Sequence, residues 1–84
     1  MANIIIYTTN TCPYCVTAKQ LLTKKNQSYT EIKIDQNPEL ADEMIKKSKR
    51  YTVPQIFIND VHVGGSDDLY ALERSGKLDE LLKS

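Results

Sequence analysis

The chain has 84 residues with 11 basic and 11 acidic side chains, so its formal net charge is zero. This length supports one domain with a modest hydrophobic core, and an apolar share of 40% is typical of a globular chain rather than a disordered one. The balanced charge gives no sign of a nucleic-acid groove or of an anionic membrane surface as a partner. We therefore expect one domain over residues 1–84 that binds neither nucleic acid nor membrane.

The N-terminal run MANIIIYTTN contains no basic segment and no long apolar stretch. It therefore predicts neither a signal peptide nor a membrane span. We expect a cytoplasmic protein, and in that compartment thiols are kept reduced and structural disulfides are rare.

The first part of the chain predicts a strand, a helix and a second strand. Residues 3–8 (NIIIYT) are rich in β-branched residues and bounded by polar ones, which favours a buried strand. Residues 13–25 favour a helix, because Pro13 suits a first helical position and apolar residues follow at helical spacing. Residues 28–35 alternate well enough for a second strand.

The second part predicts a helix, a hairpin and two further helices. Residues 37–48 favour a helix with Asn37 as its N-cap. IFI and VHV then flank a two-residue turn at 59–60. Ser66 or Asp67 can cap the next helix, which runs through Arg74 and stops at Gly76, and KLDELLK forms a last short helix.

The predicted order is β-α-β-α-β-β-α, an α/β fold. A strand–helix–strand unit implies a parallel pair with a right-handed crossover, and a hairpin adds antiparallel strands. We expect a small mixed sheet with helices packed on its faces.

The two cysteines of the chain, Cys12 and Cys15, lie at the start of the first predicted helix. Residues three apart on a helix have Cβ atoms about 5–6 Å apart, which is compatible with reversible disulfide formation. The helix N-terminus presents unpaired N–H groups that stabilise a thiolate. Cys12, the outer residue, is the expected nucleophile, and Cys15, one turn in, is the expected resolving thiol.

Two other uses of the cysteines are weaker. A disulfide staple across two residues closes a very small loop and constrains the unfolded chain little. A closed zinc site takes four ligands, and the single histidine, His62, is far away in the sequence, so we expect no metal. C-x-x-C beside a β-α-β pattern instead favours a thioredoxin-like redox site.

Three segments carry a resemblance to a known family. CPYC (12–15), TVPQIFI (52–58) and GGSDDL (64–69) occur in the order and spacing of the short bacterial dithiol glutaredoxins, and the likeness covers essentially the whole chain. The resemblance implies a thioredoxin-like fold with a four-stranded mixed sheet. It also implies glutathione-dependent reduction of protein disulfides and protein–glutathione mixed disulfides, with glutathione as the reductant.

The resemblance further implies roles for single residues. Cys12 would attack a mixed disulfide and Cys15 would resolve protein disulfides. A cis peptide bond would precede Pro54, with the Val53 backbone pairing with the cysteine of glutathione. Asp67 and the N–H groups at the start of its helix would hold the γ-glutamyl end.

Other residues complete the expected glutathione site. A helix N-terminus suits a carboxylate, and a cation from KKSKR, either Arg50 or Lys47, suits the glycyl carboxylate. Tyr14 would cover the sulfur pair. The remaining expected contacts are Thr52, Gly65 and Ser66.

Two positions depart from the family pattern. The family often has lysine where this chain has Thr9, so one source of thiolate stabilisation is missing. It also often has cysteine where this chain has Ser66, which should leave the mechanism intact.

Two alternatives stay open. One is a glutaredoxin dimer that carries an iron–sulfur cluster with glutathione as co-ligand, although Pro13 and Cys15 argue against it. The other is an electron donor served by thioredoxin reductase. We expect a monomer whose partners are glutathione and disulfide-bonded or glutathionylated proteins, with ribonucleotide reductase as a family expectation.

Overall fold

The computed structural model describes residues 2–83, and it has the predicted element order with one added 3-10 turn. The elements are β1 (Ile4–Thr8), α1 (Pro13–Lys24), β2 (Thr30–Lys33), η1 (Ile34–Gln36), α2 (Pro38–Ser48), β3 (Gln55–Ile58), β4 (Val61–Gly64), α3 (Ser66–Ser75) and α4 (Lys77–Leu82).

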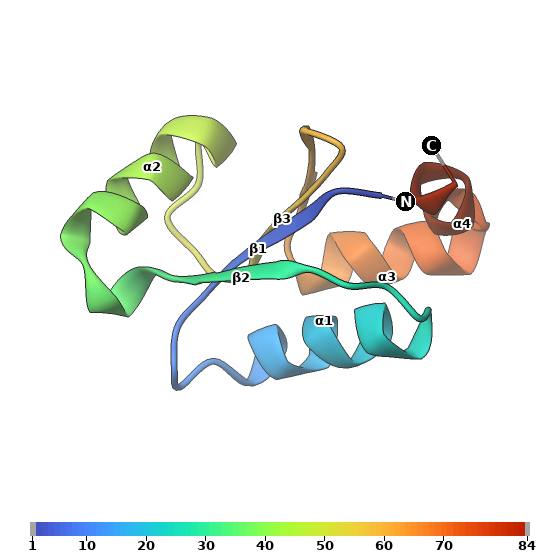
Figure 1. Cartoon of the computed structure of the whole chain (residues 1–84), viewed down its shortest axis with the longest axis horizontal. Coiled ribbons are helices and arrows are strands. Elements are labelled where there is room, and N and C mark those ends of the chain that lie inside the picture. Colours follow the sequence, from blue (N-terminus) through green and yellow to red (C-terminus); the bar gives the residue numbers. More distant parts are fainter. Residues whose placement is uncertain (1, 84) are drawn as a thin grey trace.

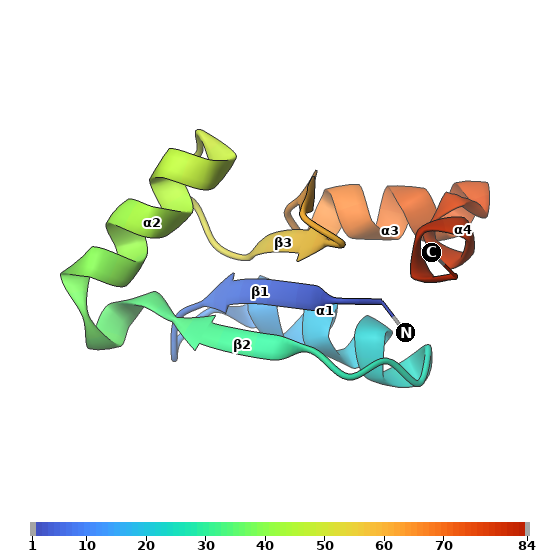
Figure 2. The ribbon, with the colours of Figure 1, turned by 45° about the horizontal axis from the view of Figure 1, so that its top comes forward.

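The four strands form one mixed sheet in the order β2-β1-β3-β4. β1 pairs with β2 in parallel and with β3 in antiparallel, and β4 pairs in antiparallel with β3 (Figure 2). In the register of the sheet, Ile6 at the centre of β1 lies between Glu31 and Ile56. The α/β fold with a thioredoxin-like, four-stranded mixed sheet is confirmed.

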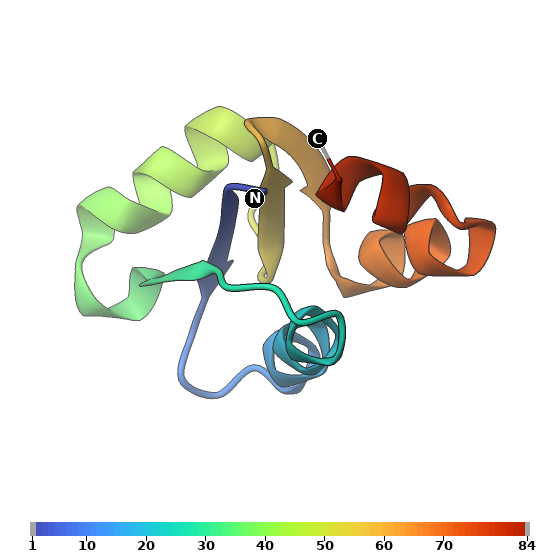
Figure 3. The same cartoon turned by 45° about the vertical axis from the view of Figure 1, so that its right-hand side comes forward.

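Helices cover both faces of this sheet. α1 and α3 lie on one face and α2 lies on the other (Figures 1 and 3). Because side chains alternate along a strand, β1 contributes Ile4 and Ile6 to the larger core under α1 and α3, and Tyr7 to the smaller core that contains Met44 of α2.

The hairpin between β3 and β4 turns where the sequence predicts it. Asn59 and Asp60 have φ angles of 51° and 67°, and the type I′ two-residue hairpin turn needs positive φ at both positions. Asn59 N also donates to the Asn3 carbonyl at 2.7 Å, which ties the turn to the chain just before β1.

The second strand is shorter than the predicted 28–35. It covers Thr30–Lys33, and the chain then enters η1 at Ile34. Within that turn the Asp35 carboxylate accepts a hydrogen bond from Asn10 N at 3.1 Å. The segment is therefore bonded to the loop before α1 and does not extend the sheet.

The cap of α3 also differs from the prediction. Its N-cap is Gly65, rather than Ser66 or Asp67, and Asp68 accepts a hydrogen bond from Gly65 N at 2.9 Å. The prediction was wrong because a glycine also serves as an N-cap. The carboxylate of the acidic residue three positions later then accepts the hydrogen bond from the N–H of the cap residue.

Within residues 2–83, the longest helices are too short or too polar to cross a bilayer.

Candidate active site

Cys12 and Cys15 lie at the N-terminus of α1. Cys12 is the N-cap, and its sulfur accepts a hydrogen bond from Cys15 N at 3.2 Å. Both cysteines are free thiols in this structure. The expected placement, with Cys12 at the cap and Cys15 one turn in, is confirmed, and it brings the Cys12 sulfur to the positive end of the helix dipole.

The two thiols have different surroundings. Cys15 is 1% exposed, whereas Cys12 is partly exposed. Burial raises the pKa of Cys15 to about 12, and its hydrogen bond with Cys12 acts in the same direction. Cys15 is therefore a protonated thiol in the reduced protein, and Cys12 is the sulfur that an incoming disulfide can reach.

The loop before β3 lies against the Cys12 sulfur. The Val53–Pro54 peptide bond is cis, as the resemblance implied. Cys12 Sγ lies 3.7 Å from the Val53 carbonyl oxygen, so the thiol can donate to it. The backbone of this loop therefore forms one wall beside the site of sulfur chemistry.

A buried glutamine supports that loop. The Gln55 side chain is fully buried, and its Nε2 donates to the Thr52 carbonyl at 3.0 Å and to Thr52 Oγ1 at 3.3 Å. Its Oε1 lies 2.8 Å from His62 Nε2 on β4. Gln55 is not among the residues predicted from the sequence, although a glutamine inside an otherwise apolar strand is itself a signal for a hydrogen-bonded buried side chain.

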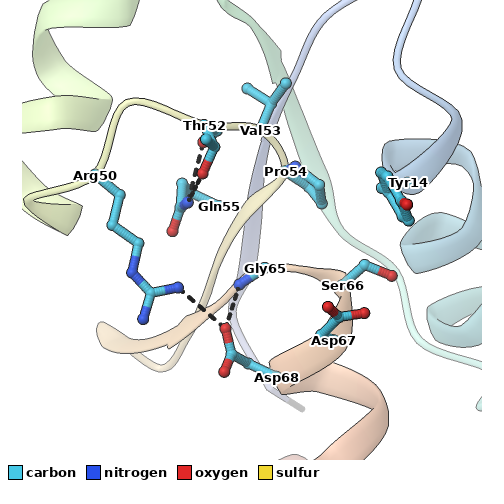
Figure 4. A pocket seen from close by; sticks show the side chains of 10 residues that line it. All are labelled: Tyr14, Arg50, Thr52, Val53, Pro54, Gln55, Gly65, Ser66, Asp67 and Asp68. Carbon is cyan, nitrogen blue, oxygen red and sulfur yellow. Dashed lines mark hydrogen bonds and ion pairs between the residues drawn. The ribbon is translucent and has the colours of Figure 1, made fainter.

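A cleft of about 220 Å³ opens along this loop (Figure 4). Eight of the predicted glutathione contacts line it, namely Tyr14, Arg50, Thr52, Val53, Pro54, Gly65, Ser66 and Asp67, and they are joined by Gln55 and Asp68. Tyr14 and Arg50 stand at opposite ends of the cleft in Figure 4, with the start of α3 between them.

Lys47 is placed elsewhere. It lines a separate pocket with Tyr7 and Phe57, on the face of the sheet that α2 covers. The reason is the end of α2, where Lys49 adopts a left-handed conformation with φ of 62° and turns the chain toward the cleft. Of the two cations considered for the glycyl carboxylate, the structure brings only Arg50 to the cleft.

Charges at the start of α3 are organised by Asp68. Its carboxylate accepts from Gly65 N at 2.9 Å and pairs with Arg50 Nη1 at 3.0 Å (Figure 4). The hydrogen bond from Gly65, and then the Arg50 guanidinium, hold the pKa of Asp68 below its usual range. A guanidinium has five N–H donors, so Arg50 keeps donors for a further carboxylate.

Comparison with known proteins gives consistent matches. The family model for glutaredoxin matches residues 4–63. Glutaredoxin 3 of Escherichia coli K12 is 59% identical over 83 residues, covering 99% of this chain and 100% of that protein. A glutaredoxin of Pseudomonas aeruginosa is 55% identical over 84 residues, covering all of both chains.

Solved structures agree with these matches. The solution structure of a glutaredoxin from Brucella melitensis is 58% identical, with a TM-score of 0.87 over 99% of this chain and 90% of that one. A buckwheat glutaredoxin–glutathione complex is 27% identical, with a TM-score of 0.90 over 98% of this chain and 77% of that one.

This site combines a thioredoxin-like sheet, two thiols at a helix N-terminus and a neighbouring cis-proline loop. The combination is typical of proteins that exchange dithiols and disulfides. With the sequence matches added, the assignment becomes specific: the chain belongs to the glutaredoxin family, whose members are thiol–disulfide oxidoreductases.

Proposed function

We propose that this protein is a glutathione-dependent oxidoreductase that reduces protein disulfides and protein–glutathione mixed disulfides. The observation that carries the proposal is the cleft, because Val53 in its wall contacts the Cys12 sulfur, while Arg50 and the start of α3 lie along it. The cleft thus lies beside the Cys12 sulfur and offers complementary charges to one short peptide thiol.

The chemistry of glutathione fits these groups. The tripeptide has a carboxylate at each end and an ammonium beside its γ-glutamyl carboxylate. Arg50 can bind the glycyl carboxylate, and the N–H groups at the start of α3 can bind the γ-glutamyl carboxylate. The exposed Asp67 carboxylate can pair with the ammonium. Among the structural relatives, the buckwheat protein was solved as its glutathione complex.

Reduction of a mixed disulfide needs one thiol of the protein. The Cys12 thiolate attacks the glutathione sulfur, the protein–glutathione bond breaks, and its electron pair leaves with the substrate sulfur, which takes up a proton. A second glutathione thiolate then attacks the glutathione sulfur on Cys12, releasing glutathione disulfide and restoring Cys12. Cys15 takes no part in this route.

Reduction of a protein disulfide uses both thiols. Cys12 forms a mixed disulfide with the substrate, and Cys15 attacks the Cys12 sulfur to release the second substrate thiol. The products are a reduced substrate and a Cys12–Cys15 disulfide, which two glutathione molecules reduce in turn.

The test is a glutathione-coupled assay on two substrates, one glutathionylated and one with a protein disulfide. We expect Cys12→Ser to abolish both activities, and Cys15→Ser to keep the first and lose most of the second. Substantial activity of Cys12→Ser would contradict the assignment of the nucleophile. If thioredoxin reductase reduces the oxidised protein and glutathione does not, the result would favour the alternative of an electron donor served by thioredoxin reductase.

A second candidate function is carriage of an iron–sulfur cluster by a dimer. A solved structure described as "Metal Binding of Glutaredoxins" is 58% identical to this chain, with a TM-score of 0.76. Within residues 2–83 there is no group of three or more His, Cys, Asp or Glu side chains that could hold a metal ion. An iron–sulfur cluster would therefore need ligands from a second chain or from glutathione. Visible absorbance of protein purified without oxygen distinguishes this candidate.

The wider partners also belong to the proposal. We propose a cytoplasmic monomer that acts on disulfide-bonded or glutathionylated proteins, with ribonucleotide reductase as one substrate to be tested. Tyr14, which is 64% exposed at the rim of the cleft, is positioned to contact such a substrate.

A further inference from the structure

A charged network that the exchange steps above do not use lies beside the buried thiol. Lys19 Nζ is 2.9 Å from Glu31 Oε2, and Thr8 Oγ1 donates to the same oxygen at 2.7 Å. Thr8 is fully buried, and the side chains of Lys19 and Glu31 are 27% and 24% exposed. A partly buried ion pair of this kind is screened less by salt than a surface pair.

The backbone places this network next to Cys15. Lys19 follows Cys15 by four residues on α1, so the two side chains share a face of the helix. Glu31 is paired in the sheet with Ile6, and Thr8 lies two residues further along the same strand, so all three point to the face under α1. The network joins the Cys15 turn of α1 to β1 and β2.

Both members of the pair stay ionised over the working pH range. The hydrogen bond to Glu31 raises the pKa of Lys19 above its ordinary value. The hydrogen bond from Thr8, and then the one from Lys19, lower the pKa of Glu31. The pair therefore supplies a fixed positive charge near the thiol, together with a fixed negative charge that opposes it.

We propose that Lys19 is a positioning residue for the resolving step, in which its ammonium stabilises the Cys15 thiolate, and that Glu31 moderates this effect by neutralising part of the charge. This inference rests on the proposed dithiol exchange, and it concerns only the step that Cys15 performs.

That step transfers electrons within a mixed disulfide. Cys15 loses its proton to solvent, and its thiolate attacks the Cys12 sulfur. The Cys12–Cys15 bond forms while the bond from Cys12 to the substrate sulfur breaks. The substrate sulfur leaves with the electron pair and is reduced, and the two protein thiols are oxidised.

Two groups counteract the effect of burial on the pKa of Cys15. Burial, and then the hydrogen bond with Cys12, raise the pKa of Cys15, whereas the backbone N–H of Thr9 and the charge of Lys19 lower it. Glu31 and Tyr29 act on Lys19 from the β2 side. Lys19 is thus the cation through which a substitution can change the thiolate population of Cys15.

The experiment separates the two thiols in one stopped-flow trace. Reduced protein is mixed with an excess of an aromatic disulfide that releases a coloured thiolate. The first equivalent of colour reports attack by Cys12, and the second reports attack by Cys15 on the mixed disulfide. Glutathione is absent, so the result does not depend on the proposed glutathione site.

We expect Lys19→Gln to slow the second phase about threefold and to leave the first unchanged. Loss of a nearby opposite charge raises a pKa by about one. The resulting roughly tenfold loss of thiolate is partly offset by a roughly threefold gain in nucleophilicity as the pKa rises. Glu31→Gln should speed the second phase, Lys19→Arg should stay near the wild-type rate, and Lys24→Gln in the last turn of α1 is the matched control.

A second readout needs no turnover. In Cys12→Ser, Cys15 is the one remaining thiol, and its rate of alkylation by iodoacetamide at a fixed neutral pH follows its thiolate fraction. Adding Lys19→Gln should slow this alkylation, and adding Glu31→Gln should speed it. The proposal is overturned if both substitutions change the second phase in the same direction, or if they do not change the alkylation rate in opposite directions, because a merely structural pair would give those results.

Discussion

Asp67 and Asp68 are adjacent acidic residues with different surroundings. Asp68 is bound to Gly65 N and to Arg50, so its carboxylate is engaged in holding the start of α3. Asp67 is exposed, and it lines both the cleft and the neighbouring pocket toward Tyr70. We therefore assign the structural role to Asp68 and leave the binding role to Asp67.

Substitution of each residue by alanine should separate these roles. Asp67→Ala should remove the proposed charge-assisted bond to the glutathione ammonium, worth roughly 1.5–3 kcal/mol, so we expect the apparent constant for a glutathionylated substrate to weaken about ten- to a hundredfold. Asp68→Ala removes a helix-cap hydrogen bond and should lower the stability by about 0.5–2 kcal/mol. Melting temperature and the substrate constant are measured on both variants. A reversed pattern would exchange the two assignments.

At the residue scale, the sequence predicts those side-chain positions that depend only on nearby residues in the chain. The placement of Cys12 at the N-cap and of Cys15 one turn into α1 follows from a three-residue spacing at a helix start, which needs no tertiary information. Gln55 and Asp68 escaped prediction because their roles depend on contacts with Thr52, His62 and Arg50, which are brought near only by the fold.

At the level of elements, the passage from β4 to α3 forms one side of the cleft. Gly64 ends β4 with a φ of 117°, and a Cβ built on it would overlap the carboxylate of Asp68. The absence of a side chain at Gly64 is therefore what lets Asp68 reach back to Gly65 N.

Gly64→Ala should damage the start of α3 and the cleft together. The added methyl group must displace Asp68, and the backbone is also strained at this positive φ, so we expect a larger loss of stability than from Gly76→Ala. Gly76 has a φ of 81° with open space around its Cβ position, so its substitution costs only the left-handed strain of about 1–2 kcal/mol. Denaturant unfolding and the substrate constant are measured on both variants. Equal losses of stability with an unchanged constant would contradict the role given to Gly64.

Element types were predictable here, but some boundaries were not. The alternation of residues 28–35 is also compatible with the observed strand of four residues followed by η1, because period-two hydrophobicity does not mark where pairing stops. The end of α2 is similar, since nothing in KKSKR indicates that Lys49 takes the left-handed conformation. That turn is what separates Arg50 from Lys47.

On the scale of the whole molecule, Glu31, His62 and Asp68 link stability to acid pH, because the pKa of each is lowered in the folded protein. Burial, and then the charge of Arg50, lower the pKa of His62. The pKa values of Glu31 and Asp68 are also lowered, by hydrogen bonds to their carboxylates. For each group the unfolded chain binds a proton at higher pH than the folded chain, so stability must fall as the pH falls through the interval between the two values.

We expect unfolding free energy to decline in two stages on acidification. The first begins near the ordinary pKa of histidine, about 6.5, and the second near that of the carboxylates, about 4. His62→Gln should remove the first stage and keep the second. The measurement is denaturant unfolding at a series of pH values. An unaltered first stage in His62→Gln would show that another group causes it.

The burial of Cys15 has a kinetic consequence. Only the Cys12 sulfur is within reach of solvent, so the oxidised substrate and the reductant must use the same atom, one after the other. The two cannot occupy it together, and each therefore acts as a competitor of the other. For the proposed function we therefore expect turnover in two alternating half-reactions, with an excess of either partner slowing the half-reaction of the other.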